Sequence, residues 1–137
     1  MNVPSDLLLK VRGWVEKAEN DLSNARNTLK MDADCPFDTV CFHAQQTAEK
    51  YIKAFLVFHG IDFPKTHDLV ILAKLALNAA LNDLLITDVQ PLNRYSVEAR
   101  YPGEWDPIDR AEAEQAVAFA VKARSAVRNC LPKEVLF

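Results

Sequence analysis

Three histidines and several basic residues are the side chains of this sequence best suited to chemistry. His43 precedes Gln46 by three residues and Lys50 by seven, so a helix would place the three on one face within two turns. An imidazole, an amide and an ammonium group can together bind a phosphate, and the imidazole can also transfer a proton. We therefore predict a ligand-binding group of His43, Gln46, Lys50 and the neighbouring Lys53.

A second candidate group lies later in the chain. Arg94 and Arg100 could supply cations for a phosphate, and Tyr95 and Tyr101 could supply surfaces on which a base stacks. Arg100 and Tyr101 stand just before Pro102, where a helix must end. They could equally form a structural tie, with the guanidinium bonded to carbonyl groups and the phenol to a carboxylate.

Each histidine also has a structural interpretation. His43 could form a hydrogen bond across a helical bundle or across a dimer seam. His67 could be a helix-start residue whose ring bonds a neighbouring loop, and His59, beside a glycine, could cap a helix C-terminus. If the protein is a catalyst, His43, His67 and Arg100 are the candidate catalytic residues.

Other kinds of catalytic and metal chemistry lack their usual sequence patterns. The chain contains no glycine-rich phosphate loop, no HExxH and no GxSxG. Cys35, Cys41 and Cys130 are odd in number and have no CxxC spacing, which argues against a disulfide framework and against a zinc site. We therefore expect no metal, no cofactor, and reduced, mostly buried thiols.

Length and composition limit the class of protein. The 137 residues, 50% of them hydrophobic, predict a single domain over residues 1–137. The formal net charge of −3 gives no overall attraction for nucleic acid, so phosphate binding would need a local basic patch. No apolar run approaches the roughly 20 residues that cross a bilayer, and the N-terminus does not look like a secretory signal. We expect a cytoplasmic protein without a membrane segment.

The elements that must position these groups are helices. Between residues 5 and 30 the apolar side chains recur every three or four positions, and further helices are expected at 38–59, 66–82, 88–99 and 106–131. Asp38, Asp88 and Asp106 mark helix starts, and Gly60 marks the end of the second helix. No alternating apolar and polar run predicts a strand. The sequence predicts an all-α, up-down bundle of four or five helices.

Two helix faces carry further expectations. The last helix places small side chains on one stripe, which predicts close packing against a neighbour: Ala113, Ala116, Ala120, Ala123, Val127 and Cys130. On the second helix the polar sector that carries His43, Gln46, Glu49, Lys50 and Lys53 also contains Phe42 and Val57. This sector is either a solvated face or a surface for self-association or a ligand. The second alternative predicts a homodimer.

The order and spacing of several motifs resemble those of the HEPN domain over nearly the whole chain. These motifs are Trp14, Ala18, Asp21 and Leu22; FHAQQTAEK at residues 42–50; Gly60; Thr66, His67, Asp68 and Leu69; Tyr95; and ARYP at residues 99–102. The resemblance implies a small helical bundle, commonly dimeric. It also implies a toxin–antitoxin-like pair in which the partner is a minimal nucleotidyltransferase.

The resemblance also brings in the catalytic members of the wider HEPN superfamily, which are metal-independent RNases. These share a motif in which an arginine is followed, after four to six residues, by a histidine. This sequence departs from that pattern, because no arginine stands at that spacing before His43, His59 or His67. We therefore expect a module that binds nucleotide or RNA and interacts with a partner. A divergent, metal-independent endoribonuclease toxin and a purely structural adaptor remain the alternatives.

Overall fold

The computed structural model describes residues 3–96 and 107–136, and all regular structure in these ranges is helical. The helices are α1 (Ser5–Leu29), α2 (Phe37–Phe58), α3 (Leu69–Asn78), α4 (Ile86–Val89) and α5 (Arg110–Arg128), with two 3₁₀ helices, η1 (Gln90–Tyr95) and η2 (Lys133–Val135). The predicted all-α fold is confirmed.

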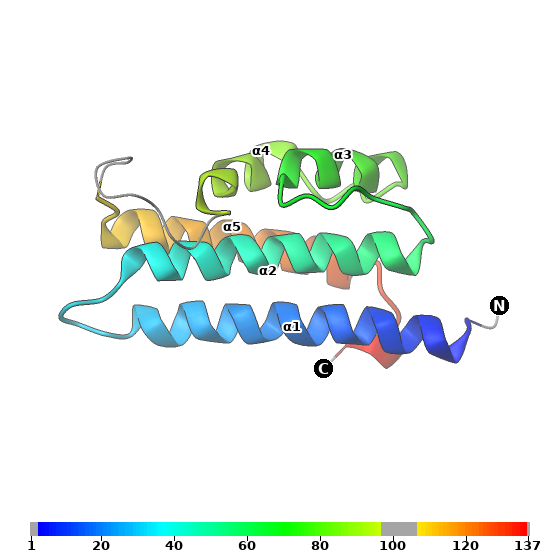
Figure 1. Cartoon of the computed structure of the whole chain (residues 1–137), viewed down its shortest axis with the longest axis horizontal. Coiled ribbons are helices and arrows are strands. Elements are labelled where there is room, and N and C mark those ends of the chain that lie inside the picture. The colour runs from blue at the N-terminus through cyan, green and yellow to red at the C-terminus, as the bar shows by residue number, and fades with distance from the viewer. Residues whose placement is uncertain (1–2, 97–106, 137) are drawn as a thin grey trace.

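Helix α2 lies at the centre of the bundle (Figure 1). α1 and α2 form an antiparallel hairpin, and α5 packs along α2. On the side of the bundle away from α1, α3 and η1 pack against α2, and α4 packs against α3 and α5. The segment between α2 and α5 returns the chain, so α5 runs in the same direction as α2. Because α2 contacts α1, α3, α5 and η1, even polar residues on it become buried.

The core follows the predicted helix faces. α1 buries residues at steps of three and four, and α5 buries most of the expected small-residue stripe: Val11, Val15, Ala18, Leu22 and Ala25 on α1; Ala113, Ala116, Ala120, Ala123 and Val127 on α5. Small side chains on α5 let its backbone approach α2 closely. The expectation of mostly buried thiols is met by Cys41, whereas Cys35 is half-buried and Cys130 is exposed.

One carboxylate ties the three long helices together. Glu19 of α1 accepts two hydrogen bonds from the guanidinium of Arg124 on α5, at 2.8 and 2.9 Å, and one from the phenol of Tyr51 on α2, at 2.5 Å. Burial alone would raise the pKa of Glu19, but these bonds outweigh it, and the pKa lies below its ordinary value. Glu19 therefore stays ionised and fixes the position of α2 relative to its neighbours.

Several predicted boundaries are wrong by a few residues, and local hydrogen bonds explain the differences. The helix expected at 66–82 begins only at Leu69, because the Asp68 side chain accepts from backbone N–H groups of the first turn. It ends at Asn78, and Ala80 adopts a left-handed conformation (φ 68°). Of the helix expected at 88–99, residues 97–99 lie outside the described residues, and the described part is α4 followed by the 3₁₀ helix η1, in which Pro91 cannot donate a backbone hydrogen bond.

The ends of α2 and the start of α5 also differ in detail from the prediction. α2 begins at Phe37, so Asp38 lies within its first turn and not at the cap, while Gly60 has the expected left-handed φ of 67°. α5 begins at Arg110 and not at Asp106, because Asp109 caps it by accepting from the backbone N–H of Glu112 at 2.8 Å. Asp106 itself lies outside the described residues.

Candidate functional site

Polar side chains of α2 lie on two neighbouring stripes that face different partners. His43 and Lys50 face α1, whereas Gln45, Glu49 and Lys53 recur at steps of four and face residues 59–68. The sequence placed His43, Lys50 and Lys53 in one sector of the helix. The solvated-face alternative for that sector is wrong, because Glu49 and Lys53 are buried and His43, Gln46 and Lys50 are partly buried.

The first stripe is organised by Asp21 of α1. Oδ1 of Asp21 lies 2.8 Å from Nδ1 of His43, and Oδ2 accepts from Nζ of Lys50 at 2.5 Å. Asp21 is buried, so it needs these partners for its charge. His43 therefore makes the hydrogen bond across the bundle that its structural interpretation predicts.

The second stripe is organised by Glu49. Its carboxylate accepts from Nε2 of Gln45 at 3.1 Å and from Nζ of Lys53 at 3.0 Å, and it lies 2.9 Å from Nδ1 of His67. Gln45 also donates to the backbone oxygen of His67 at 3.2 Å. The loop before α3 is thus held against α2 through both the ring and the backbone of His67.

One further amide extends the second stripe. Nε2 of Gln46 donates to Oε1 of Gln45 at 2.6 Å. At the end of this stripe, Nζ of Lys53 lies 5.7 Å from the ring centres of both Trp14 and Phe63, where it forms cation–π contacts. The first predicted ligand-binding group is therefore divided between two polar clusters, which together we call the α2 network: Asp21, His43 and Lys50 in the first, and Gln45, Gln46, Glu49, Lys53 and His67 in the second.

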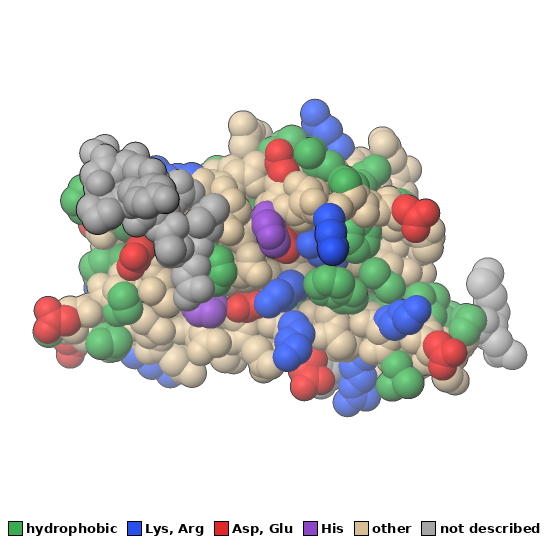
Figure 2. Space-filling view, in the orientation of Figure 1, with side chains coloured by type: hydrophobic (Ala, Val, Ile, Leu, Met, Phe, Trp, Pro, Cys, Tyr) green, Lys and Arg blue, Asp and Glu red, His purple; other side chains and the backbone are tan. Residues whose placement is uncertain are grey.

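His67 is the most exposed of these side chains. Its side chain is 66% exposed, whereas that of Glu49, to which it is bonded, is only 4% exposed. Beside His67 lies an open groove of about 360 Å³ lined by Thr66, His67, Asp68, Asn93 and Ser96. Figure 2 shows histidine and several Lys or Arg side chains, with acidic side chains among them, on the face of the molecule that it presents over α1 and α2.

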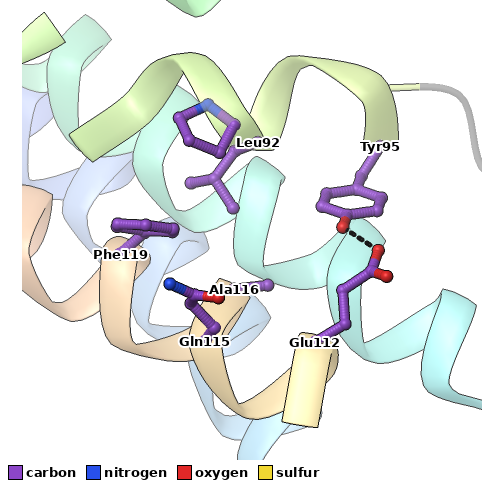
Figure 3. Close-up of a pocket in the computed structure, with 7 residues that line it drawn as sticks. Leu92, Tyr95, Glu112, Gln115, Ala116 and Phe119 are labelled. Atoms are coloured by element: carbon purple, nitrogen blue, oxygen red, sulfur yellow. Dashed lines mark hydrogen bonds between the residues drawn. The ribbon is translucent and has the colours of Figure 1, made fainter. Parts of the chain in front are cut away.

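The second predicted group is only partly within the described residues. Arg94 and Tyr95 lie at the end of η1, whereas Arg100 and Tyr101 lie outside the described residues. The phenol of Tyr95 donates to the carboxylate of Glu112 on α5 beside a small pocket of about 60 Å³ (Figure 3), and Nη1 of Arg94 lies 3.8 Å from Oε2 of Glu112. The described half of this group is therefore tied to a carboxylate.

Burial suppresses acid–base chemistry around Tyr95. Burial, followed by the bond to the Glu112 carboxylate, raises the pKa of Tyr95 far above its ordinary value of 10. Burial and the charge of Glu112 likewise raise the pKa of the Cys41 thiol to about 12. Both groups therefore stay protonated near neutral pH, and Cys41 is not a thiolate nucleophile.

The predicted ligand-binding residues did not include Asp21, Gln45 or Glu49, although Glu49 was placed in the polar sector of the second helix. A signal for Asp21 was present, because it stands three residues after Ala18 and four before Ala25, where the helix period requires a core residue. A carboxylate at a core position must be paired with a cation or a donor. Gln45 and Glu49 gave no comparable signal, since both belong to a helix with polar residues on many sides.

Within residues 3–96 and 107–136 no group of three or more His, Cys, Asp or Glu side chains is arranged to hold a metal ion. None of the helices in the same ranges is long and apolar enough to cross a membrane.

One protein family and two known proteins are similar to this chain. The HEPN domain family matches residues 11–130. The chain is 25% identical over 136 residues to a protein of Methanocaldococcus jannaschii named "Putative toxin MJ1304", and the match covers 88% of each chain. Its fold is similar to the crystal structure of ST0689, an archaeal HEPN homologue, with a TM-score of 0.67 and 23% identity over 88% of this chain and 96% of the other.

Proposed function

The chain belongs to the HEPN domain family, and we propose that it acts as a homodimeric module that binds nucleotide or RNA. We further propose that it pairs with a minimal nucleotidyltransferase in a toxin–antitoxin-like system. Similarity to a protein named as a toxin supports the second part. Copurification with the product of an adjacent nucleotidyltransferase gene tests the pairing, and the absence of such a neighbour and of any complex would contradict it.

The observation that carries the binding proposal is the α2 network. Through Glu49 it brings Gln45 and Lys53 of α2 together with His67 at the edge of an open groove. Lys50 and Lys53 are each paired with a buried carboxylate, so their charges are largely compensated. Additional positive charge for a phosphate would come from Arg94 and Arg100, which we propose as the phosphate-contacting residues.

Salt titration of RNA binding tests this proposal. We expect saturable binding of single-stranded RNA at low salt that weakens steeply as salt rises, because phosphate contacts release counterions. Arg100→Glu should abolish binding. Lys10→Glu, at an exposed position on α1, makes the same change in net charge and should bind like the unmodified chain. Failure to bind mono-, di- and oligonucleotides at low salt would favour the structural-adaptor alternative.

We propose that the isolated protein does not cleave RNA efficiently. Cleavage needs a proton-transfer group and a cation near one linkage, and these contribute about 10² to 10⁴-fold each. The Arg-to-His spacing that supplies both in catalytic relatives is missing, and the described partners of His43 and His67 are the carboxylates Asp21 and Glu49. We expect only background cleavage of total RNA without metal.

One observation favours the alternative, a divergent metal-independent endoribonuclease. His67 is exposed and is held by the buried carboxylate of Glu49, which is the arrangement of a general base with its orienting group. Cleavage by the unmodified chain that is lost in His67→Ala, His43→Ala and Arg100→Ala would establish this alternative and exclude a pure binding role.

The proposed dimer rests on Phe42 and Val57. Both are only half-buried, and fifteen helical residues separate them by roughly 22 Å, so a seam using both would run along most of α2. Val57→Glu should shift the protein toward monomer in sedimentation experiments, because a charge would be desolvated in the seam. Leu9→Glu, at an exposed apolar position on α1, is the matched control and should leave the assembly unchanged. A monomeric unmodified protein at tens of micromolar would refute the dimer.

A further inference from the structure

The groove beside His67 is lined by polar side chains. Thr66 and Ser96 contribute hydroxyl oxygens, Asp68 contributes a carboxylate, and His67 contributes a ring that is 66% exposed. Its volume of about 360 Å³ is at the lower end of the range of small-molecule sites, about 300–1,000 Å³. The groove is therefore large enough to hold part of a nucleotide, and its polar lining can form hydrogen bonds with it.

Glu49 determines which nitrogen of the His67 ring carries the proton and which is left to bind a ligand. The Glu49 carboxylate already accepts from the Lys53 ammonium and the Gln45 amide, and a carboxylate with these partners has no proton to donate. Nδ1 of His67, at 2.9 Å, must therefore be the donor in the third contact. In the neutral ring this leaves Nε2 as an acceptor, on the side away from the buried carboxylate.

Asp68 adds a second acceptor to the groove. The Asn93 amide and backbone N–H groups of α3 all donate to its Oδ1, which leaves Oδ2 able to accept from a ligand among the groups described. The Asn93 bond also lowers the pKa of Asp68, so the group is ionised near neutral pH. An ionised carboxylate would repel a phosphate placed in the groove itself but would accept readily from a hydroxyl group.

We infer that this groove is a ribose subsite in which Nε2 of His67 and the Asp68 carboxylate accept hydrogen bonds from sugar hydroxyl groups. In this assignment Glu49 is a positioning residue, because it acts on the ligand only by holding His67 in the tautomer that accepts. The inference rests on the proposed function, since the ribose belongs to the nucleotide or RNA that the module binds. In this assignment the groove makes the protein bind ribose in preference to deoxyribose, because the 2′-hydroxyl group distinguishes the two sugars.

Paired binding measurements test the subsite. Fluorescence anisotropy would compare a short RNA strand of A, C and G with the DNA strand of the same sequence at low salt. We expect the RNA to bind about three- to tenfold more tightly, which corresponds to one neutral hydrogen bond from the 2′-hydroxyl to Nε2 of His67. His67→Ala should reduce the preference to near unity by weakening RNA binding alone; because it also removes one donor from the buried Glu49 carboxylate, circular dichroism must show that the variant is folded. His59→Ala, at an exposed histidine outside the groove, should retain the preference.

The outcomes separate this inference from the proposed function. Equal binding of RNA and DNA by the unmodified chain would overturn the ribose subsite while leaving nucleic-acid binding intact. Absence of binding to either strand would overturn both. A preference for RNA that survives His67→Ala would also overturn the subsite.

Ring-nitrogen NMR tests the positioning role of Glu49 independently of any ligand. We expect His67 of the unmodified chain to carry its proton on Nδ1. Glu49→Gln removes the charge that favours this tautomer, and combining it with Lys53→Met removes the ammonium that would otherwise be left without its carboxylate. The ring of the folded double variant should shift toward the Nε2–H tautomer and lose part of the preference for RNA. An unmodified ring already protonated on Nε2 would overturn the assignment.

Discussion

The buried pair of Glu49 and Lys53 should be a major determinant of stability once one partner is removed. The two side chains are 4% and 10% exposed, and their charged atoms lie 3.0 Å apart. At an effective dielectric constant of about 20, two unit charges at this distance attract by roughly 5 kcal/mol. Lys53→Met keeps the length of the side chain but leaves the Glu49 carboxylate buried without its cation.

We expect Lys53→Met to reduce the free energy of unfolding by about 3 kcal/mol. Breaking a buried ion pair costs roughly 3–5 kcal/mol. The lower end applies here because Gln45 and His67 still donate to the Glu49 carboxylate. The variant also loses the contacts of the ammonium with the rings of Trp14 and Phe63.

Urea unfolding followed by circular dichroism measures this loss. Glu49→Gln combined with Lys53→Met should cost less than the sum of the single variants, because neither charge is then left unpaired. Lys10→Met, at an exposed position on α1, should change stability by no more than about 0.5 kcal/mol. A loss below about 1 kcal/mol for Lys53→Met, or strict additivity in the double variant, would show that the pair is not desolvated as the structure indicates.

Three other predictions concern capping, packing and pH. Asp68→Ala should lower the free energy of unfolding by about 1 kcal/mol through loss of the α3 cap, and Asp68→Asn should restore most of it in the same urea assay. Ala120→Leu should cost about 1–3 kcal/mol by overpacking the buried α5 stripe, and an unchanged melting temperature would contradict the close approach of α5. Because the pKa of Glu19 is lowered in the folded chain, its stabilising contribution is complete above its unfolded pKa of about 4.5 and is lost as pH falls through the lower folded value. Unfolding midpoints between pH 6 and 2 should therefore fall less steeply in Glu19→Gln than in the unmodified chain.

The helices could be predicted because each depends on residues close together in the sequence. The apolar period of α1 and α5 requires one buried face wherever the neighbours lie, and the three- and four-residue steps are visible directly in the chain. The left-handed turn at Gly60 depends only on the missing side chain of glycine. The start of α3 was harder, because Thr66, Asp68 and their neighbours offer several caps and the Asn93 amide, 25 residues away, helps to hold the one that is used.

Sequence alone determined which helices form, which of their faces are apolar, and that His43, Gln46, Lys50 and Lys53 share a helix. Only the tertiary structure decided their partners, because Asp21 and His43 are 22 residues apart and Glu49 and His67 are 18 apart. The physical reason is the cost of burying charge. Once α1 and the loop before α3 cover α2, each buried carboxylate needs donors from whichever segment is packed against it, and that neighbour is set by the packing of the whole bundle.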